Sequence, residues 1–71
     1  MKTQVVTVFD GITFSGVTRA DAPYAERMRQ CYAIIQSLVY NRLDYMPDVE
    51  TIKRHIVRVE TTRNCKTFIR R

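Results

Sequence analysis

With 71 residues, the chain is long enough for one small domain, and we expect residues 1–71 to form it. Hydrophobic residues make up 45% and charged residues 27%, as in ordinary globular proteins, which excludes wholesale disorder. The net charge of +5 is uneven, because residues 51–71 hold seven lysines and arginines against one acid. Charge gathered at one end of a small chain indicates an acidic partner, either nucleic acid or an acidic protein surface.

A core of this size is only marginally stable without a disulfide, a metal or a partner subunit. We therefore expect either a homodimer or a surface that a partner covers. The apolar run at residues 5–9 is shorter than the core of a signal peptide, and no segment has the length of a membrane span. A cytoplasmic location without membrane contact is the expectation.

Residues 5–17 carry the clearest local signal, that of a β-hairpin. β-branched and aromatic residues flank Asp10-Gly11, a dipeptide that suits a type I′ turn because both central positions need positive φ. A two-residue loop predicts the pairs Phe9–Ile12, Thr7–Phe14 and Val5–Gly16, which gather the large side chains on one face. The opposite face then holds Val6, Val8, Thr13, Ser15 and Val17. We expect Val6 and Val8 to contact a protein partner there.

A long amphipathic helix is predicted to follow the hairpin. Asp21 is the expected N-cap, with Pro23 in the first turn, where the missing N–H costs little. Continuing past Asn41 would bring Arg42 into the apolar stripe, so we end the helix there. The stripe consists of Tyr24, Met28, Cys31, Ile35, Leu38 and Val39, flanked by Tyr32 and Ile34.

A second, short helix is predicted from Pro47 and Asp48 toward His55, because a proline and acids suit a first helical turn. Its apolar side holds Val49, Ile52 and Ile56. From Ile56 the period of the sequence changes to two, which indicates a strand. A regular strand would place Val57, Val59 and Thr61 on one face and Ile56, Arg58 and Glu60 on the other.

A C-terminal hairpin is predicted from the residues that follow this strand. A two-residue loop at 63–64 would place Val59 and Lys66 on the same face, whereas a three-residue loop at 62–64 aligns Val57 and Val59 with Cys65 and Ile69. We prefer the longer loop, which puts Asn64 in the left-handed position. The expected fold is a small α+β domain of order ββα(α)ββ, an antiparallel sheet with the long helix on one face.

The predicted hairpin exposes basic side chains around one aromatic ring. Cations can contact phosphates while Phe68 stacks on an unpaired base, as on sheet surfaces that bind single strands. The alternative is an ordinary solvated face, with Phe68 packed under the helix. The candidate residues for binding nucleic acid or an acidic partner are Arg58, Arg63, Lys66, Phe68, Arg70 and Arg71.

The sequence shows no pattern that indicates catalysis. His55 is the only histidine and lies in a basic context without an adjacent carboxylate, so we expect a structural role. Cys31 and Cys65 are expected to be buried and reduced, and they form no metal-ligand set with His55. We therefore expect a protein that is not an enzyme and needs no cofactor, metal or small-molecule substrate.

Tyr40 is the candidate for a protein contact on the long helix. It projects from the polar side, near small residues that would let a partner approach. The other three tyrosines, Tyr24, Tyr32 and Tyr45, are expected in the core or at its margin.

The residues thus predict a small non-enzymatic binding or regulatory protein whose basic C-terminal hairpin engages an acidic partner, with nucleic acid favoured. The aromatic among the cations supports this interpretation. The alternative is an inhibitor or adaptor, of the kind that small mobile-element proteins often provide, which blocks an acidic surface of another protein. Glu60 within the basic hairpin and the lack of an established nucleic-acid-binding motif favour this alternative.

Overall fold

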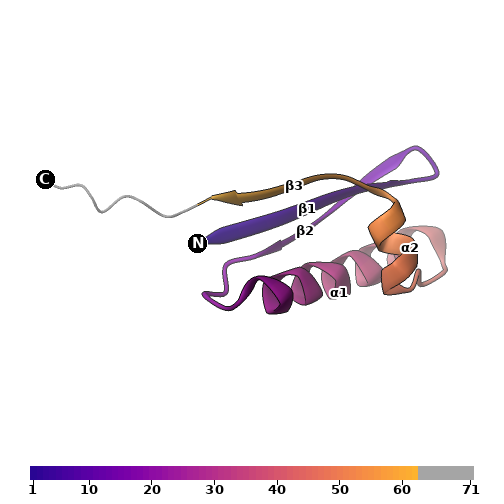
Figure 1. Cartoon of the computed structure of the whole chain (residues 1–71). Coiled ribbons are helices and arrows are strands. Elements are labelled where there is room, and N and C mark those ends of the chain that lie inside the picture. The colour runs from indigo at the N-terminus through magenta and orange to yellow at the C-terminus, as the bar shows by residue number, and fades with distance from the viewer. Residues whose placement is uncertain (63–71) are drawn as a thin grey trace, which may run out of the picture.

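A computed structural model describes residues 1–62 and gives an α+β domain with one antiparallel sheet and two helices. The three strands lie in the order β2-β1-β3, and both helices lie on the same side of the sheet (Figure 1). The elements are β1 (Lys2–Phe9), β2 (Ile12–Thr18), α1 (Tyr24–Leu43), α2 (Val49–Arg54) and β3 (Ile56–Thr62).

The N-terminal hairpin forms with the predicted loop and register. Asp10 and Gly11 connect β1 to β2, with φ of 54° and 74°, the positive values that a type I′ turn requires. All three predicted pairs are present: Phe9–Ile12, Thr7–Phe14 and Val5–Gly16. The turn chemistry therefore fixes the register, and the register sends the large side chains to the helix side of the sheet.

The long helix α1 begins and ends two residues later than predicted. Its N-cap is Pro23 and no side chain caps it, so the prediction for Asp21 is wrong. The helix continues through Leu43 and ends at Asp44, which takes the left-handed conformation while its N–H bonds to Tyr40 C=O at 3.0 Å. Arg42 is exposed, so it did not need to interrupt the helix.

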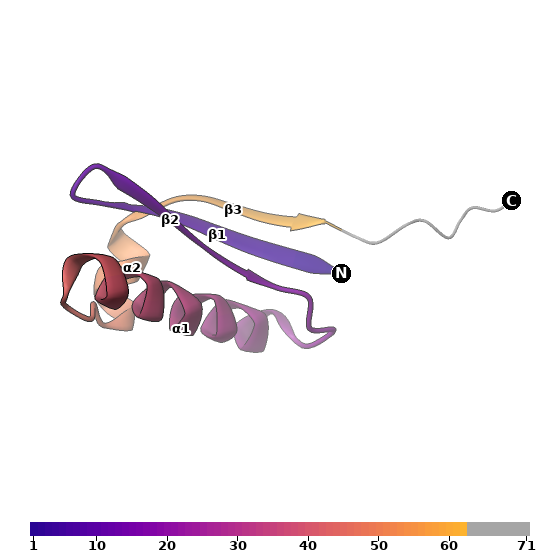
Figure 2. The same cartoon turned by 180° about the vertical axis from the view of Figure 1, so that it is seen from behind.

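Helix α1 packs on β2 and β1, as the view from behind shows (Figure 2). The contact is close at Gly16, where an added Cβ would lie 2.3 Å from the carbonyl oxygen of Cys31. The two backbones can approach this closely only because glycine has no side chain. The core beneath the sheet consists of Val5, Phe9, Phe14, Met28, Cys31, Tyr32, Ile35, Val39 and Ile52.

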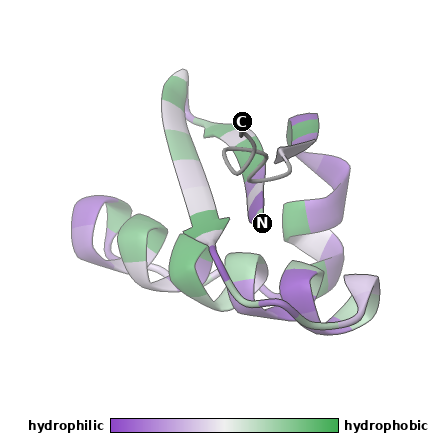
Figure 3. Ribbon diagram, turned by 90° about the vertical axis from the view of Figure 1, so that its left-hand side faces the viewer, coloured by the Kyte–Doolittle hydropathy of each residue, from purple (hydrophilic) through white to green (hydrophobic). Residues whose placement is uncertain are grey.

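The burial of α1 differs from the predicted stripe at its edges. Leu38 and Ile34 are about two-fifths exposed, whereas Arg27 is buried, with its Nη1 donating to Met1 Sδ at 2.7 Å. Arg27 also lies over the Tyr24 ring, 5.6 Å from its centroid. Both helices carry hydrophobic and hydrophilic residues (Figure 3), as expected where only one side of each is buried.

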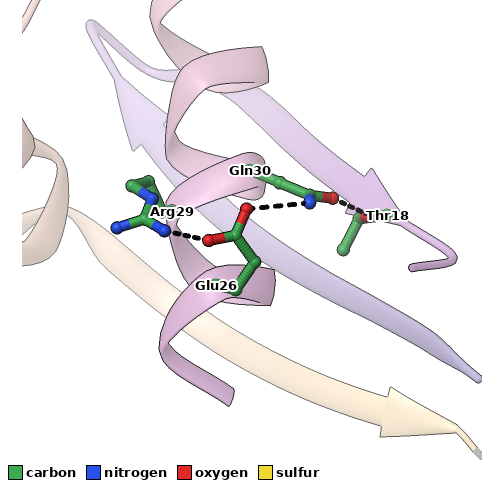
Figure 4. Close-up of polar contacts among 4 residues, drawn as sticks. All are labelled: Thr18, Glu26, Arg29 and Gln30. Carbon is green, nitrogen blue, oxygen red and sulfur yellow. Dashed lines mark hydrogen bonds and ion pairs between the residues drawn. The ribbon is translucent and has the colours of Figure 1, made fainter. Parts of the chain in front are cut away.

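A line of polar contacts joins the first turns of α1 to the end of β2 (Figure 4). Thr18 donates to Gln30 Oε1 at 2.5 Å, and Gln30 Nε2 donates to Glu26 at 3.2 Å. Glu26 also pairs with Arg29 on the exposed side. These bonds hold the connection between strand and helix beside the buried core.

The short helix α2 is capped by Asp48. Its carboxylate accepts a bond of 2.8 Å from the N–H of Thr51, so Asp48 is the N-cap instead of part of the first turn. Ile52 is fully buried, and Val49 and Ile56 pack against the same core, as predicted for the apolar side. The His55 ring stacks on Phe9 with centroids 4.4 Å apart and closes this end of the domain.

Strand β3 pairs with β1 but contains a β-bulge. Arg58 lies opposite Val6, whereas Ile56 lies opposite Thr7, so Val57 is the extra residue. The bulge brings Ile56 to the same side as Val59, and the prediction of strict alternation across Ile56 and Val57 is wrong. The physical reason is that Ile56 gains burial against the core while Val57 stays 63% exposed.

The predicted C-terminal hairpin lies partly outside the described residues. Its first strand is β3, and the predicted loop at 62–64 and second strand at 65–70 extend beyond residue 62. The part of the chain that the structure describes thus shows the α+β class and the element order ββααβ.

Candidate binding surface

The sheet face that points away from the helices is here called the open face. No helix of residues 1–62 covers it (Figure 1). By strand register its residues are Lys2, Gln4, Val6 and Val8 on β1, Thr13, Ser15 and Val17 on β2, and Arg58, Glu60 and Thr62 on β3. The face is mixed, with small and β-branched residues on β2 and the charges on β1 and β3.

Arg58 is the predicted binding residue that the structure describes, and it lies on the open face. Its guanidinium Nε is 3.5 Å from Glu60 Oε2, two residues further along the same strand. Both side chains are about half exposed or more, so this pair adds little to stability. Arg58 is accessible to a partner, but part of its charge is neutralised locally.

The remaining predicted binding residues, Arg63, Lys66, Phe68, Arg70 and Arg71, lie outside the described residues. In the sequence they follow β3 directly, and β3 ends at Thr62 beside Lys2 of β1. Exposed Lys53 and Arg54 of α2 precede β3, with Glu50 3.8 Å from Lys53 Nζ.

The three predicted protein-contact residues differ in exposure. Val6 is only 9% exposed between Ser15 and Arg58 on the neighbouring strands, so it offers little area. Val8 is half-buried on the same face. Tyr40 is 50% exposed on α1, which leaves it accessible as predicted.

The other tyrosines are less buried than predicted. Tyr32 is buried, whereas Tyr24 and Tyr45 are about half exposed. Tyr45 packs edge-on against Phe9, with centroids 6.5 Å apart. Burial raises the pKa of the Tyr32 hydroxyl, and the nearby Tyr24, Cys31 and Glu50 add smaller effects of the same sign. The exposed tyrosines form no single stripe.

The helix side of β3 is a surface that sequence reasoning did not identify as a site. Val59 and Thr61 point to the side where α1 lies but remain exposed, because α1 packs on β2 and β1 instead. They leave the last strand partly uncovered on this side as well. The alternating Val-Arg-Val-Glu sequence was the available signal for a strand exposed on both faces.

The Cys31 thiol and the His55 ring, two groups that could take part in chemistry, are both held in contacts within the fold. Cys31 is fully buried and its Sγ donates to Thr3 C=O at 3.6 Å. Burial raises the pKa of the Cys31 thiol, which keeps it protonated and unreactive. His55 Nδ1 lies 2.8 Å from Thr51 C=O, while its ring stacks on Phe9. Cys65 lies outside the described residues.

Among residues 1–62, no three side chains of the metal-binding types His, Cys, Asp and Glu gather in one place. Neither helix in this part of the chain has the length and apolar character needed to cross a membrane. Comparison of the sequence and fold with models of protein families, with curated proteins and with solved structures finds no match.

Proposed function

We propose that the protein is a small non-enzymatic binding module that engages an acidic partner, nucleic acid in the first place, through the open face near β3 and the basic C-terminal residues. The observation that carries this proposal is the position of Arg58. It is exposed on a sheet face that neither helix of residues 1–62 covers, on the strand that leads directly into Arg63, Lys66, Phe68, Arg70 and Arg71.

Electrostatics supports nucleic acid as the partner. Residues 51–71 hold seven cationic side chains against one acid, whereas residues 1–50 hold five against six. A polyanion such as a phosphate backbone gains from several such contacts at once, since each contact releases condensed counterions. Phe68 adds a ring that suits stacking with an unpaired base, so a single strand is the favoured form.

A second candidate is an acidic surface of another protein, which the chain would block as an inhibitor or adaptor. The contact between Arg58 and Glu60 favours it, because a carboxylate beside the key cation repels phosphates. A protein surface can place its own cation opposite Glu60, whereas nucleic acid cannot.

The two candidates are separated by measuring affinity for single-stranded and duplex oligonucleotides between low and physiological salt. For nucleic acid, we expect Arg58→Ala and Arg70→Ala each to weaken binding and to reduce the salt slope by about one unit per lost phosphate contact. Phe68→Ala should cost roughly 1–3 kcal/mol on the single strand if a base stacks there.

Arg42→Ala is the matched control, because it removes the same charge from an exposed position on α1, in the helix layer. It should leave both affinity and salt slope nearly unchanged. Equal losses for Arg42→Ala and Arg58→Ala would mean that only net charge matters and that the open face is not the site. No binding of either oligonucleotide at low salt would exclude nucleic acid and leave the acidic protein surface.

A further inference from the structure

The outer edge of β3 is unpaired within residues 1–62. β3 is the last strand in the order β2-β1-β3, so only its inner edge has a partner among the described strands. Such an edge presents backbone N–H and C=O groups that can pair with a strand of another chain. The regular part of this edge runs from Arg58 to Thr62, after the bulge at Val57.

The register identifies the residues whose backbone groups point to this edge. The two-residue loop makes Phe9 and Ile12 a hydrogen-bonded pair, so alternate residues of β1 point toward β3, starting with Val8. Val8 N–H indeed bonds to His55 C=O at 3.3 Å. By the same alternation, Arg58, Glu60 and Thr62 bond toward β1. The backbone groups of Val59 and Thr61 therefore point outward.

The charges along this edge are complementary to those of a second, antiparallel copy of the same strand. Arg58 and Glu60 lie on the open face, one residue on either side of Val59. Val59 lies on the helix side and is 39% exposed. An antiparallel partner with the same sequence can therefore match a cation to an anion twice while it covers this valine.

We propose that β3 pairs antiparallel with β3 of a second copy of this chain, about a two-fold axis that passes beside Val59. Val59 then forms a hydrogen-bonded pair with Val59 of the second copy. Arg58 lies directly opposite Glu60 of the second copy, and Glu60 lies opposite its Arg58. The two sheets join into one continuous sheet, with the helices of both copies on the same side.

Neighbouring registers are less favourable for electrostatic or backbone reasons. A two-fold axis at Arg58 or at Glu60 sets like charges directly opposite each other, which destabilises a strand pair. An axis between two residues sets Val59, whose backbone groups point outward, against a residue whose groups already bond to β1. The axis beside Val59 satisfies both requirements.

The contact is short, so the dimer is weak and depends on concentration. The bulge at Val57 ends the regular pairing on one side, and bulges commonly limit association at sheet edges. A contact of this size is well below that of a permanent dimer. The inference does not depend on the proposed function, since the pairing needs no acidic partner. It is an alternative to the C-terminal hairpin predicted from the sequence, because a strand at residues 65–70 would pair with the same edge of β3.

The test is sedimentation of the full chain up to high micromolar concentration, with charge-reversal variants. Wild-type protein should show a reversible dimer. Arg58→Glu and Glu60→Arg each replace two attractive pairs by two repulsive ones, so each should raise the dimer dissociation constant at least about tenfold. An equimolar mixture of these two variants should restore the dimer, and so should the double variant with both changes.

The mixture and the double variant distinguish loss of the charge pairs between chains from an effect of net charge or folding. The double variant has the same net charge as wild type, and the mixture restores pairing only between chains. A loss that neither combination repairs would overturn the proposed register, as would a folded wild-type protein that stays monomeric at high micromolar concentration. A dimer that forms only after removal of residues 63–71 would show that this segment occupies the edge, which also overturns the proposal.

Amide hydrogen exchange gives a second measurement on wild-type protein. The N–H group of Val59 should gain protection as concentration rises, whereas those of Glu60 and Thr62 should be protected by β1 at all concentrations. Thr61 is not expected to gain protection, because it lies opposite the bulged Val57 of the second copy. Dimerisation without a gain at Val59 would place the interface elsewhere.

Discussion

The region built from β1, β2 and α1 and the region around β3 differ in what covers them. The first holds most of the core, with Val5, Cys31, Ile35 and Val39 fully buried between sheet and helix. In the second, Ile56 alone packs against the core and the rest of β3 is exposed on both faces. The difference teaches that stability resides in the first fifty-odd residues, while the last strand, β3, remains accessible for contacts.

The largest expected effect comes from truncating the centre of the covered region. Ile35→Ala should lower the free energy of unfolding by about 2–5 kcal/mol, because it removes buried methylene groups and leaves a cavity. Val57→Ala, the control, should change it by less than about 0.5 kcal/mol, because this valine is 63% exposed. Chemical denaturation followed by circular dichroism measures both. Equal effects would mean that the two regions do not differ in burial.

A smaller effect is expected at Gly16, where the backbones of α1 and β2 lie close together. Gly16→Ala would place a Cβ 2.3 Å from Cys31 C=O, so strand and helix must move apart, at a cost of about 1–3 kcal/mol. Ser15→Ala is the matched control, because Ser15 directly precedes Gly16 in the strand but points to the open face, away from α1. If Gly16→Ala proved as stable as Ser15→Ala, the close approach of the two backbones would not be essential.

The smallest expected effect concerns the cap of α2, and it depends on pH. The bond from Thr51 N–H lowers the pKa of Asp48. A lowered folded-state pKa contributes stability above the unfolded pKa, and this stability is lost as the pH falls through the folded value. Asp48→Ala should therefore destabilise the protein at neutral pH and less at acid pH.

Asp48→Asn separates the hydrogen bond from the charge, because an asparagine side chain can also cap a helix. This variant should keep most of the stability at neutral pH and lose the part of the pH dependence that Asp48 causes. Thermal unfolding at several pH values measures both variants. An Asp48→Ala effect that is the same at acid and neutral pH would show that the carboxylate charge plays no part.

Local sequence signals predicted the elements whose geometry depends on neighbouring residues. Asp10-Gly11 fixed the hairpin register, and Asp48 with Val49 and Ile52 indicated the short helix. The ends of α1 were missed because local rules favour Asp21 as a cap and Asn41 as a stop, whereas the core contact of Leu43 extends the helix. Packing against the core thus accounts for the later end of the helix.

The bulge at Val57 is a feature of the candidate site that local sequence signals could not predict. It follows from pairing β3 with β1, about fifty residues away in the sequence, and from the burial of Ile56. The exposure of Arg58 and its place on the same face as Glu60 were predictable from the sequence, but the outward direction of the Val59 backbone groups required the register. The candidate residues after Thr62 lie outside the described part and stay predictions.

The most direct test of the proposed function is an NMR titration of the full ¹⁵N-labelled protein with a mixed-sequence single-stranded oligonucleotide at low salt. We predict chemical-shift changes at Lys2, at Arg58 and within residues 63–71 that fade as salt rises, because phosphate contacts are salt-dependent. Changes confined to α1, for instance around Arg29 and Arg42, or no changes at low salt, would contradict the assignment of the open face and the basic C-terminal residues to nucleic-acid binding.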